Sequence, residues 1–159
     1  MSAERLVDGL IQRGWNLALA ESCTGGLIAA AVTEVPGSSS AFGLGVVTYS
    51  YEAKEQLLGV SQEMLLAHGA VSEACVESML LGVERLSGAT VCAAVTGIAG
   101  PGGATADKPV GTVWIGLSCG QDRWRKVHVF DGDRSAVRQQ TVDCVVQGLT
   151  QVLEGEAPW

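Results

Sequence analysis

The sequence predicts an α/β fold: a three-layer α/β/α sandwich with a mixed, mostly parallel sheet and a C-terminal antiparallel hairpin. Helical and strand patterns alternate along the chain, and no composition break, linker or internal repeat separates them. The length of 159 residues is that of one ordinary domain, so residues 1–159 are expected to form a single domain. Two strand patterns joined by a short polar turn near the C-terminus make the predicted sheet mixed.

The first part of the chain predicts two helices and two strands. Residues 3–13 carry apolar side chains at helical spacing, which indicates an amphipathic helix. A short apolar run over residues 16–20 is typical of a buried strand, and an Ala-rich helical pattern follows over 27–32. Glycine and β-branched residues then predict a strand over 43–49.

The rest of the chain predicts four helices and three strands. Ser61 and Ser72 stand just before helical patterns, where N-cap residues are expected. A β-branched run follows, and a polar turn then joins two further strand patterns. The expected helices are 52–58, 61–68, 73–86 and 133–153, the expected strands are 90–95, 110–117 and 124–130, and residues 154–159 are expected to be frayed.

The overall charge argues against nucleic acid as the partner. The formal net charge is -7, and no block of lysines or arginines forms a basic arm. No segment approaches the ~20 uninterrupted apolar residues that a membrane span needs. An apolar α/β domain of this size often self-associates, so a homo-oligomer is expected.

The cysteines and histidines indicate a reducing compartment and no metal site. The five cysteines are odd in number and contain no Cys-x-x-Cys pair, and the N-terminus carries no apolar signal run. This pattern favours the cytoplasm over secretion. The two histidines, His68 and His128, lie near no second ligand at a useful spacing, so no metal is expected.

Three Gly-rich loops with hydroxyl side chains, 21–26, 36–42 and 96–103, each border a predicted strand. Ligands of open α/β sheets bind in the crevice at the strand ends, and glycines let backbone amides approach an anion. A single loop of this kind is more often a plain connection, and three consecutive serines are as often a solvated turn. The three loops together favour one polar cleft.

A serine and a lysine flank the predicted strand 43–49. If the chain returns on itself, Ser39 and Lys54 come together, and a serine nucleophile with a lysine base requires that pairing. By default Lys54 would be a surface lysine. Cys23 could also be a nucleophile, but no histidine is an obvious partner and a packed cysteine is the simpler interpretation. Arg134, at the start of the last helix, could bind a phosphate.

An ordered set of motifs resembles a known family. The motifs are Glu-Ser-Cys-Thr-Gly-Gly at 21–26, Pro-Gly-Ser-Ser at 36–39, Val-Val-Thr-Tyr-Ser at 46–50, Glu-Ala-Lys at 52–54, His-Gly-Ala-Val-Ser-Glu at 68–73, Thr-Gly-Ile-Ala-Gly-Pro at 96–101, Lys-Pro-Val-Gly-Thr-Val at 108–113 and Gly-Asp-Arg at 132–134. Together they resemble the CinA C-terminal domain family, the competence/damage-inducible proteins, over about residues 3–150.

The resemblance implies an enzyme without metal or cofactor that hydrolyses the carboxamide of nicotinamide mononucleotide. The products are nicotinic acid mononucleotide and ammonia, in pyridine-nucleotide recycling. The implied dyad consists of Ser39 as nucleophile and Lys54 as base, with Tyr49 as a further catalytic group. The resemblance also places Ser22, Thr96 and Arg134 at polar active-site positions. The substrate-binding residues are expected to be Ser22, Thr24, Gly25, Thr96, Gly97 and Arg134.

Two other functions remain open on the sequence. One is a nucleotide-binding or regulatory module of the same fold without turnover, and the other is a structural subunit whose apolar surfaces serve assembly. Thermal stabilisation by the mononucleotide without ammonia release would favour the first, and the absence of any ligand response would favour the second.

Overall fold

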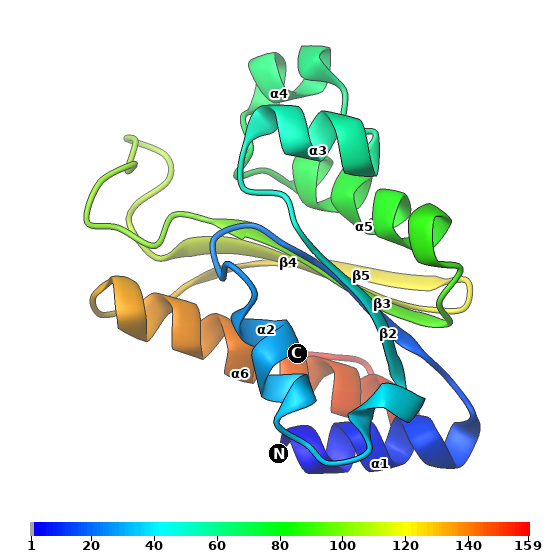
Figure 1. Ribbon diagram of the computed structural model, residues 1–159. Helices are drawn as coiled ribbons and strands as arrows, with labels where there is room; N and C mark the ends of the chain where they lie inside the picture. The colour runs from blue at the N-terminus through cyan, green and yellow to red at the C-terminus, as the bar shows by residue number, and fades with distance from the viewer. Residues whose placement is uncertain (1) are drawn as a thin grey trace.

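A computed structural model describes residues 2–159 and confirms the predicted fold class. The chain forms a five-stranded sheet with helices on both faces (Figure 1). The helices are α1 (Ala3–Arg13), α2 (Leu27–Thr33), α3 (Tyr51–Leu58), α4 (Gln62–His68), α5 (Glu73–Ser87) and α6 (Arg134–Leu153). The strands are β1 (Leu17–Glu21), β2 (Phe42–Val47), β3 (Val91–Gly97), β4 (Thr112–Cys119) and β5 (Asp122–Val129).

The strand order in the sheet is β2-β1-β3-β4-β5. Strand β1 pairs in parallel with β2 and β3, and β4 is antiparallel to both β3 and β5. Four of the five strands therefore run in one direction, and β4 with β5 forms the predicted hairpin. The carboxyl ends of β1, β2 and β3 lie at one edge of the sheet, where ligand sites of such sheets form.

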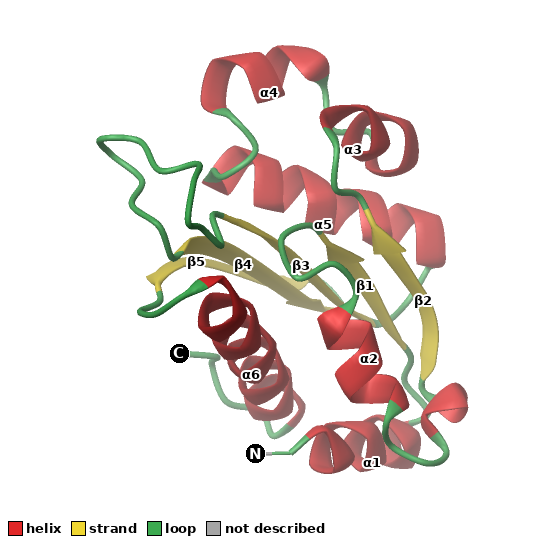
Figure 2. Cartoon of the chain, turned by 60° about the vertical axis from the view of Figure 1, so that its left-hand side comes forward, coloured by secondary structure: helices red, strands yellow, loops and turns green. Residues whose placement is uncertain are grey.

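Alternation along the central strands creates a core on each face of the sheet. Helices α1, α2 and α6 lie on one face of the sheet, and α3, α4 and α5 lie on the other (Figure 2). Leu17 and Leu19 of β1 belong to the core on the first face, whereas Ala18 and Ala20 belong to the core on the second. The same alternation continues in β3. Small alanines on the second face let α5 lie close to the sheet.

Side-chain caps explain where several helices begin. Ser50, Ser61 and Ser72 each accept a hydrogen bond from the backbone N–H three residues later, at the starts of α3, α4 and α5. Ser61 and Ser72 confirm the predicted caps. The cap at Ser50 fixes the start of the helix that carries Lys54.

Two local expectations were wrong. Ser38–Ser40 forms a short 3-10 helix ahead of β2, where these residues were expected to belong to the Gly-rich loop 36–42. The C-terminal segment is not frayed throughout: the Trp159 ring lies edge-on to His128, with ring centres 5.3 Å apart, and Pro158 is buried. Burial of apolar side chains against the sheet orders this segment, and helix or strand propensity does not report such burial.

Gly82 of α5 lies directly against the backbone of α3, and its replacement by alanine is expected to destabilise the fold. A Cβ at this position would lie 2.7 Å from the Cα of Leu58, so one of the two helices must move. Overpacking of this kind costs about 1–3 kcal/mol of unfolding free energy, which urea denaturation would measure. Gly43→Ala is the matched control, because a Cβ there meets open space. Equal stability of both variants would contradict the prediction.

Candidate active site

A pocket of about 250 Å³ opens at the carboxyl ends of β1, β2 and β3. Five segments that are far apart in sequence build it, three of which follow the strands β1, β2 and β3. Its lining consists of Ser22 and Cys23 after β1, Tyr49 and Lys54 after β2, Ala70 and Val71 before α5, the segment Thr96–Gly100 with Gly102 and Gly103 after β3, and Arg134 at the start of α6.

Lys54 is the buried cation of this pocket. Only 1% of the residue is exposed, and it is among the largest fully buried side chains. Its Nζ donates hydrogen bonds to Ser22 Oγ at 2.9 Å and to the carbonyl oxygen of Thr48 at 2.6 Å. Among residues 2–159, no carboxylate forms an ion pair with it. Burial therefore lowers the pKa of Lys54 from the ordinary lysine value, because the charged form loses its water.

Ser22 is the hydroxyl that lies beside this lysine. It follows β1 directly, its N–H donates to the carbonyl of Val95 in the neighbouring strand, and its own carbonyl accepts from Gly25 N–H. These bonds hold Ser22 in a tight turn at the end of the sheet. A serine oxygen 2.9 Å from a lysine nitrogen of lowered pKa has the geometry of a nucleophile and its base.

The structure does not bring Ser39 to Lys54. Ser39 belongs to the 3-10 helix before β2 and is exposed, whereas Lys54 follows the carboxyl end of the same strand. The parallel register pairs Leu17 with Phe42 and Glu21 with Val47, so the serine run lies at the amino edge of the sheet. The predicted Ser39–Lys54 pair is therefore wrong. Ser39 precedes β2 and Lys54 follows it, so the two residues lie at opposite ends of this strand. The chain does not fold back to bring them together.

Tyr49 and Arg134 meet at the rim of the pocket. Arg134 donates one hydrogen bond to the hydroxyl of Tyr49 at 2.8 Å and another to the carbonyl of Gly100 at 2.9 Å. The Tyr49 side chain is 58% exposed and makes no bond to Ser22 or Lys54. Arg134 thus ties the loop after β2 to the loop after β3 and presents a positive charge at the opening.

The remaining predicted binding residues fall into two groups. Thr96 and Gly97 line the pocket, and Thr96 also donates to the carbonyl of Ala70. Thr24 and Gly25 do not line it: Thr24 is fully buried and donates to the Glu21 carboxylate, and Gly25 has a left-handed φ of 60° within the turn. Thr24 and Gly25 therefore shape the turn that carries Ser22.

Two residues of this region did not emerge from the sequence. The buried carboxylate of Glu21 accepts bonds from the start of α2, and Arg138 donates to two carbonyls of the turn after β1. Arg138 lies four residues after Arg134, so both are on one face of α6. This spacing of four residues was the feature of the sequence that could have indicated Arg138.

The cysteines near the site are packing residues. Burial raises the pKa of the Cys23 thiol to about 11, so the thiol is protonated at neutral pH. Cys75 is fully buried, and burial raises its pKa to about 11 as well. All five cysteines are free. Within residues 2–159, no group of three His, Cys, Asp or Glu side chains could hold a metal ion.

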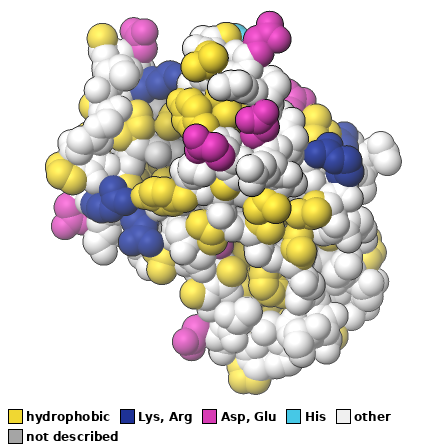
Figure 3. Space-filling view, turned by 45° about the horizontal axis from the view of Figure 1, so that its top comes forward, with side chains coloured by type: hydrophobic (Ala, Val, Ile, Leu, Met, Phe, Trp, Pro, Cys, Tyr) yellow, Lys and Arg dark blue, Asp and Glu magenta, His cyan; other side chains and the backbone are white. Residues whose placement is uncertain are grey.

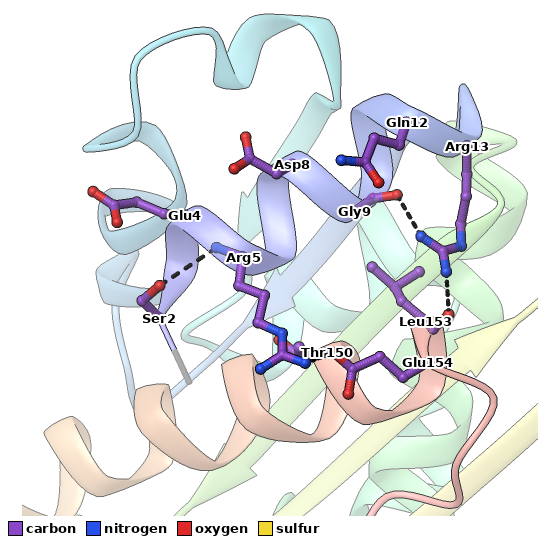
Figure 4. A pocket seen from close by; sticks show the side chains of 10 residues that line it. All are labelled: Ser2, Glu4, Arg5, Asp8, Gly9, Gln12, Arg13, Thr150, Leu153 and Glu154. Carbon is purple, nitrogen blue, oxygen red and sulfur yellow. Dashed lines mark hydrogen bonds and ion pairs between the residues drawn. The ribbon is translucent and has the colours of Figure 1, made fainter.

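A second hollow, between α1 and α6, has a different character. Figure 4 shows its side chains: Arg5 pairs with Glu154, and Arg13 donates to the carbonyls of Gly9 and Leu153. Its positive groups are engaged, and neither Ser22 nor Lys54 contributes to it. This hollow therefore contains no pair of a nucleophile and a base like that of Ser22 and Lys54.

The charged side chains give no continuous basic surface on the face seen in Figure 3. Lys and Arg groups there are separate and lie between acidic and apolar side chains. This face presents no track of positive charge for a nucleic-acid backbone. Across the described part of the chain, every helix is too short or too polar to cross a lipid bilayer.

The fold and the pocket define an α/β protein with a buried serine–lysine contact at the carboxyl edge of its sheet. Residues 1–153 match the family model of the CinA C-terminal domain, so the chain belongs to this family. The resemblance seen in the motifs is thereby confirmed.

Curated relatives carry two kinds of name. Proteins named nicotinamide-nucleotide amidohydrolase PncC are 54% identical over 129 residues in Enterobacter agglomerans and 47% identical over 150 residues in Pseudomonas putida. These matches cover 80% and 94% of this chain, and 79% and 94% of the relatives. A CinA-like protein of Thermotoga maritima is 43% identical over 96% of this chain, which spans only 37% of that longer relative.

Solved structures of the family have the same architecture. A CinA superfamily protein from Klebsiella pneumoniae 700603 superposes with a TM-score of 0.92 at 40% identity, and the match covers 96% of each chain. A competence/damage-inducible protein from Agrobacterium tumefaciens gives a TM-score of 0.91 at 39% identity, over 96% of this chain and 93% of that one.

Proposed function

We propose that this protein is a serine amidohydrolase that converts nicotinamide mononucleotide to nicotinic acid mononucleotide and ammonia. The observation that carries the proposal is the contact between the buried Lys54 amine and Ser22 Oγ inside a pocket. The relatives named nicotinamide-nucleotide amidohydrolase support the choice of substrate and reaction. Ser22 and Lys54 form the dyad, in place of the Ser39–Lys54 pair expected from the sequence.

The first half of the reaction transfers the acyl group to the protein. Neutral Lys54 accepts the Ser22 proton while Ser22 Oγ attacks the carboxamide carbon. The neutral amine still donates one hydrogen to Thr48 O. Across the 2.9 Å contact with Ser22 the direction then reverses, and the serine hydroxyl donates its proton to the lone pair of Nζ. The tetrahedral intermediate collapses as Lys54 returns the proton to the leaving nitrogen. Ammonia departs and an ester on Ser22 remains.

Water completes the cycle. Lys54 accepts a proton from a water molecule that attacks the ester carbon, and it then returns the proton to Ser22 Oγ as the ester bond breaks. The product carries a carboxylate in place of the carboxamide. Release of nicotinic acid mononucleotide fits a role in pyridine-nucleotide recycling. The five free cysteines support a place in the reducing cytoplasm.

Ammonia release from nicotinamide mononucleotide by the purified protein tests this function. We expect ammonia and nicotinic acid mononucleotide in equal amounts. The alternative, a nucleotide-binding module without turnover, predicts a higher unfolding temperature with the mononucleotide and no ammonia. The structural-subunit alternative predicts neither response.

Arg134 is expected to bind the phosphate of the substrate, so Arg134→Lys should raise KM about 10–100-fold, as for one or two lost charge-assisted hydrogen bonds. A lysine cannot bridge Tyr49 and Gly100 while it also contacts a phosphate. Steady-state kinetics with nicotinamide mononucleotide would measure the change. Tyr49→Phe should raise KM modestly, because Arg134 loses its bond to the phenol. A fall confined to kcat would contradict the mechanism above and assign protonation of the leaving nitrogen to Tyr49 in place of Lys54.

A further inference from the structure

Two charged side chains that do not line the pocket hold the turn that carries Ser22. The turn runs from Ser22 to Gly26 and connects β1 with α2. The Glu21 carboxylate contacts it through amide and hydroxyl hydrogens, and the Arg138 guanidinium contacts it through carbonyl oxygens. Such opposite contacts fix both the position and the orientation of the peptide planes between them.

Glu21 fixes the end of the turn that leads into α2. It is 1% exposed and accepts from the Thr24 hydroxyl and from the N–H groups of Gly26, Ile28 and Ala29, at 2.5, 3.2, 3.0 and 3.0 Å. No lysine or arginine pairs with this carboxylate within residues 2–159. Four hydrogen bonds compensate for the burial of its charge.

Arg138 fixes the side of the turn that faces α6. Its Nε donates to the carbonyl of Cys23 at 3.1 Å and its Nη2 to the carbonyl of Thr24 at 3.0 Å. Two successive carbonyls that point to one planar guanidinium are nearly parallel. The rigid fork of the guanidinium therefore sets two peptide planes at once.

The orientation of the amides follows from peptide geometry. A trans peptide places the N–H of the next residue opposite its carbonyl, so the N–H groups of Thr24 and Gly25 point away from Arg138. Gly25 N–H accordingly returns to the carbonyl of Ser22 at 3.0 Å. The Ser22 carbonyl points at Gly25 N–H, so the N–H of the same peptide, that of Cys23, points the opposite way and away from Arg138. Among residues 2–159 it donates to no backbone carbonyl, and Cys23 lines the pocket.

We propose that Arg138 is a positioning residue that aims the Cys23 N–H at the carboxamide oxygen of the substrate. When Ser22 attacks, that oxygen becomes negatively charged, and the N–H of the residue after the nucleophile donates to it. Arg138 itself contacts the carbonyl of Cys23 on the opposite side and does not line the pocket of Ser22 and Lys54, although with Arg134 it lines an adjoining hollow. The inference rests on the proposed function, since it assigns a role within the reaction of Ser22.

The test compares Arg138→Ala and Arg138→Lys with Arg13→Ala. Arg13 also donates to two backbone carbonyls, those of Gly9 and Leu153, but far from the pocket, so it controls for the general loss of such an arginine. Loss of one oxyanion donor lowers kcat about 10²–10³-fold in a well-studied protease. We expect a fall of about 100-fold in kcat for Arg138→Ala, a smaller fall for Arg138→Lys, and KM within about threefold of the wild type.

Two further measurements separate positioning from a structural role. The acid limb of the pH–rate profile should stay in place in Arg138→Lys, because Lys54 is unaltered. Added guanidinium should restore part of the kcat of Arg138→Ala. A kcat within about threefold of the wild type, or a loss confined to KM, would overturn the proposal. Equal losses in Arg138→Ala and Arg13→Ala would also overturn it. If Arg138→Ala does not fold, Arg138→Lys decides by the same criteria.

Labelling of Ser22 with a fluorophosphonate probe keeps this inference distinct from the choice of substrate. The probe needs the nucleophile and the oxyanion donor but no nucleotide. If the wild type does not hydrolyse nicotinamide mononucleotide but labels at Ser22, and Arg138→Ala labels at least about tenfold more slowly, the substrate assignment fails and the positioning role stands. Labelling of Arg138→Ala at the wild-type rate overturns the positioning role. A wild type that neither turns over nor labels overturns both.

Discussion

Ser22→Ala should lower the rate of ammonia release from nicotinamide mononucleotide by at least about 10⁴-fold, because it removes the oxygen that forms the acyl intermediate. The fold should persist, since the backbone bonds of Ser22 to Val95 and Gly25 do not involve its hydroxyl. Single-turnover assays would detect the residual rate, and circular dichroism would check the fold.

Ser39→Ala is the matched control for this prediction. Ser39 is exposed in the 3-10 helix at the opposite edge of the sheet, so its hydroxyl has no part in the reaction. We expect activity within about twofold of the wild type, as for surface substitutions that alter no packed contact. The reverse result, an active Ser22→Ala and an inactive Ser39→Ala, would refute the Ser22–Lys54 dyad.

Lys54→Met should inactivate the protein and stabilise its fold. Removal of the general base lowers the rate by about 10²–10⁴-fold. Methionine fills most of the same space without an amine that must be buried in a site with no carboxylate partner. The unfolding temperature at pH 7 should therefore exceed that of the wild type, and differential scanning calorimetry would measure it. An active Lys54→Met, or one less stable than the wild type, would contradict this account.

The pH dependence of the wild type follows from the same lysine. Burial lowers the pKa of Lys54 in the folded protein below the ordinary value of 10.5, so the unfolded chain binds a proton that the folded chain lacks in the window between the two values. In that window this group makes stability rise with pH. The rate should fall on the acid side as Lys54 becomes protonated, with an apparent pKa below 10.5.

Lys54→Arg tests whether the site needs a base or a charge. A guanidinium stays protonated and cannot accept the Ser22 proton. The variant should therefore be about as inactive as Lys54→Met, and its unfolding temperature should lie below that of Lys54→Met, because it buries a permanent charge. Substantial activity in Lys54→Arg would assign Lys54 to substrate binding and leave the base unidentified.

The sequence by itself determined the fold class, the element order and the family. Helical spacing over residues 3–13, a short apolar run before Glu21 and a hairpin near the C-terminus are local patterns, and local spacing decides between helix and strand. The motifs of the sequence identify six residues that line the pocket, namely Ser22, Tyr49, Lys54, Thr96, Gly97 and Arg134.

Only the tertiary structure decided which hydroxyl meets the lysine. Ser22 and Lys54 are 32 residues apart, whereas Ser39 is nearer in sequence, yet the parallel pairing of β1 with β2 places Ser22 at the carboxyl edge and Ser39 at the amino edge. The contacts of Arg138 with Cys23 and Thr24 join residues more than a hundred positions apart. Strand direction and order select these neighbours, and neither property is contained in local spacing.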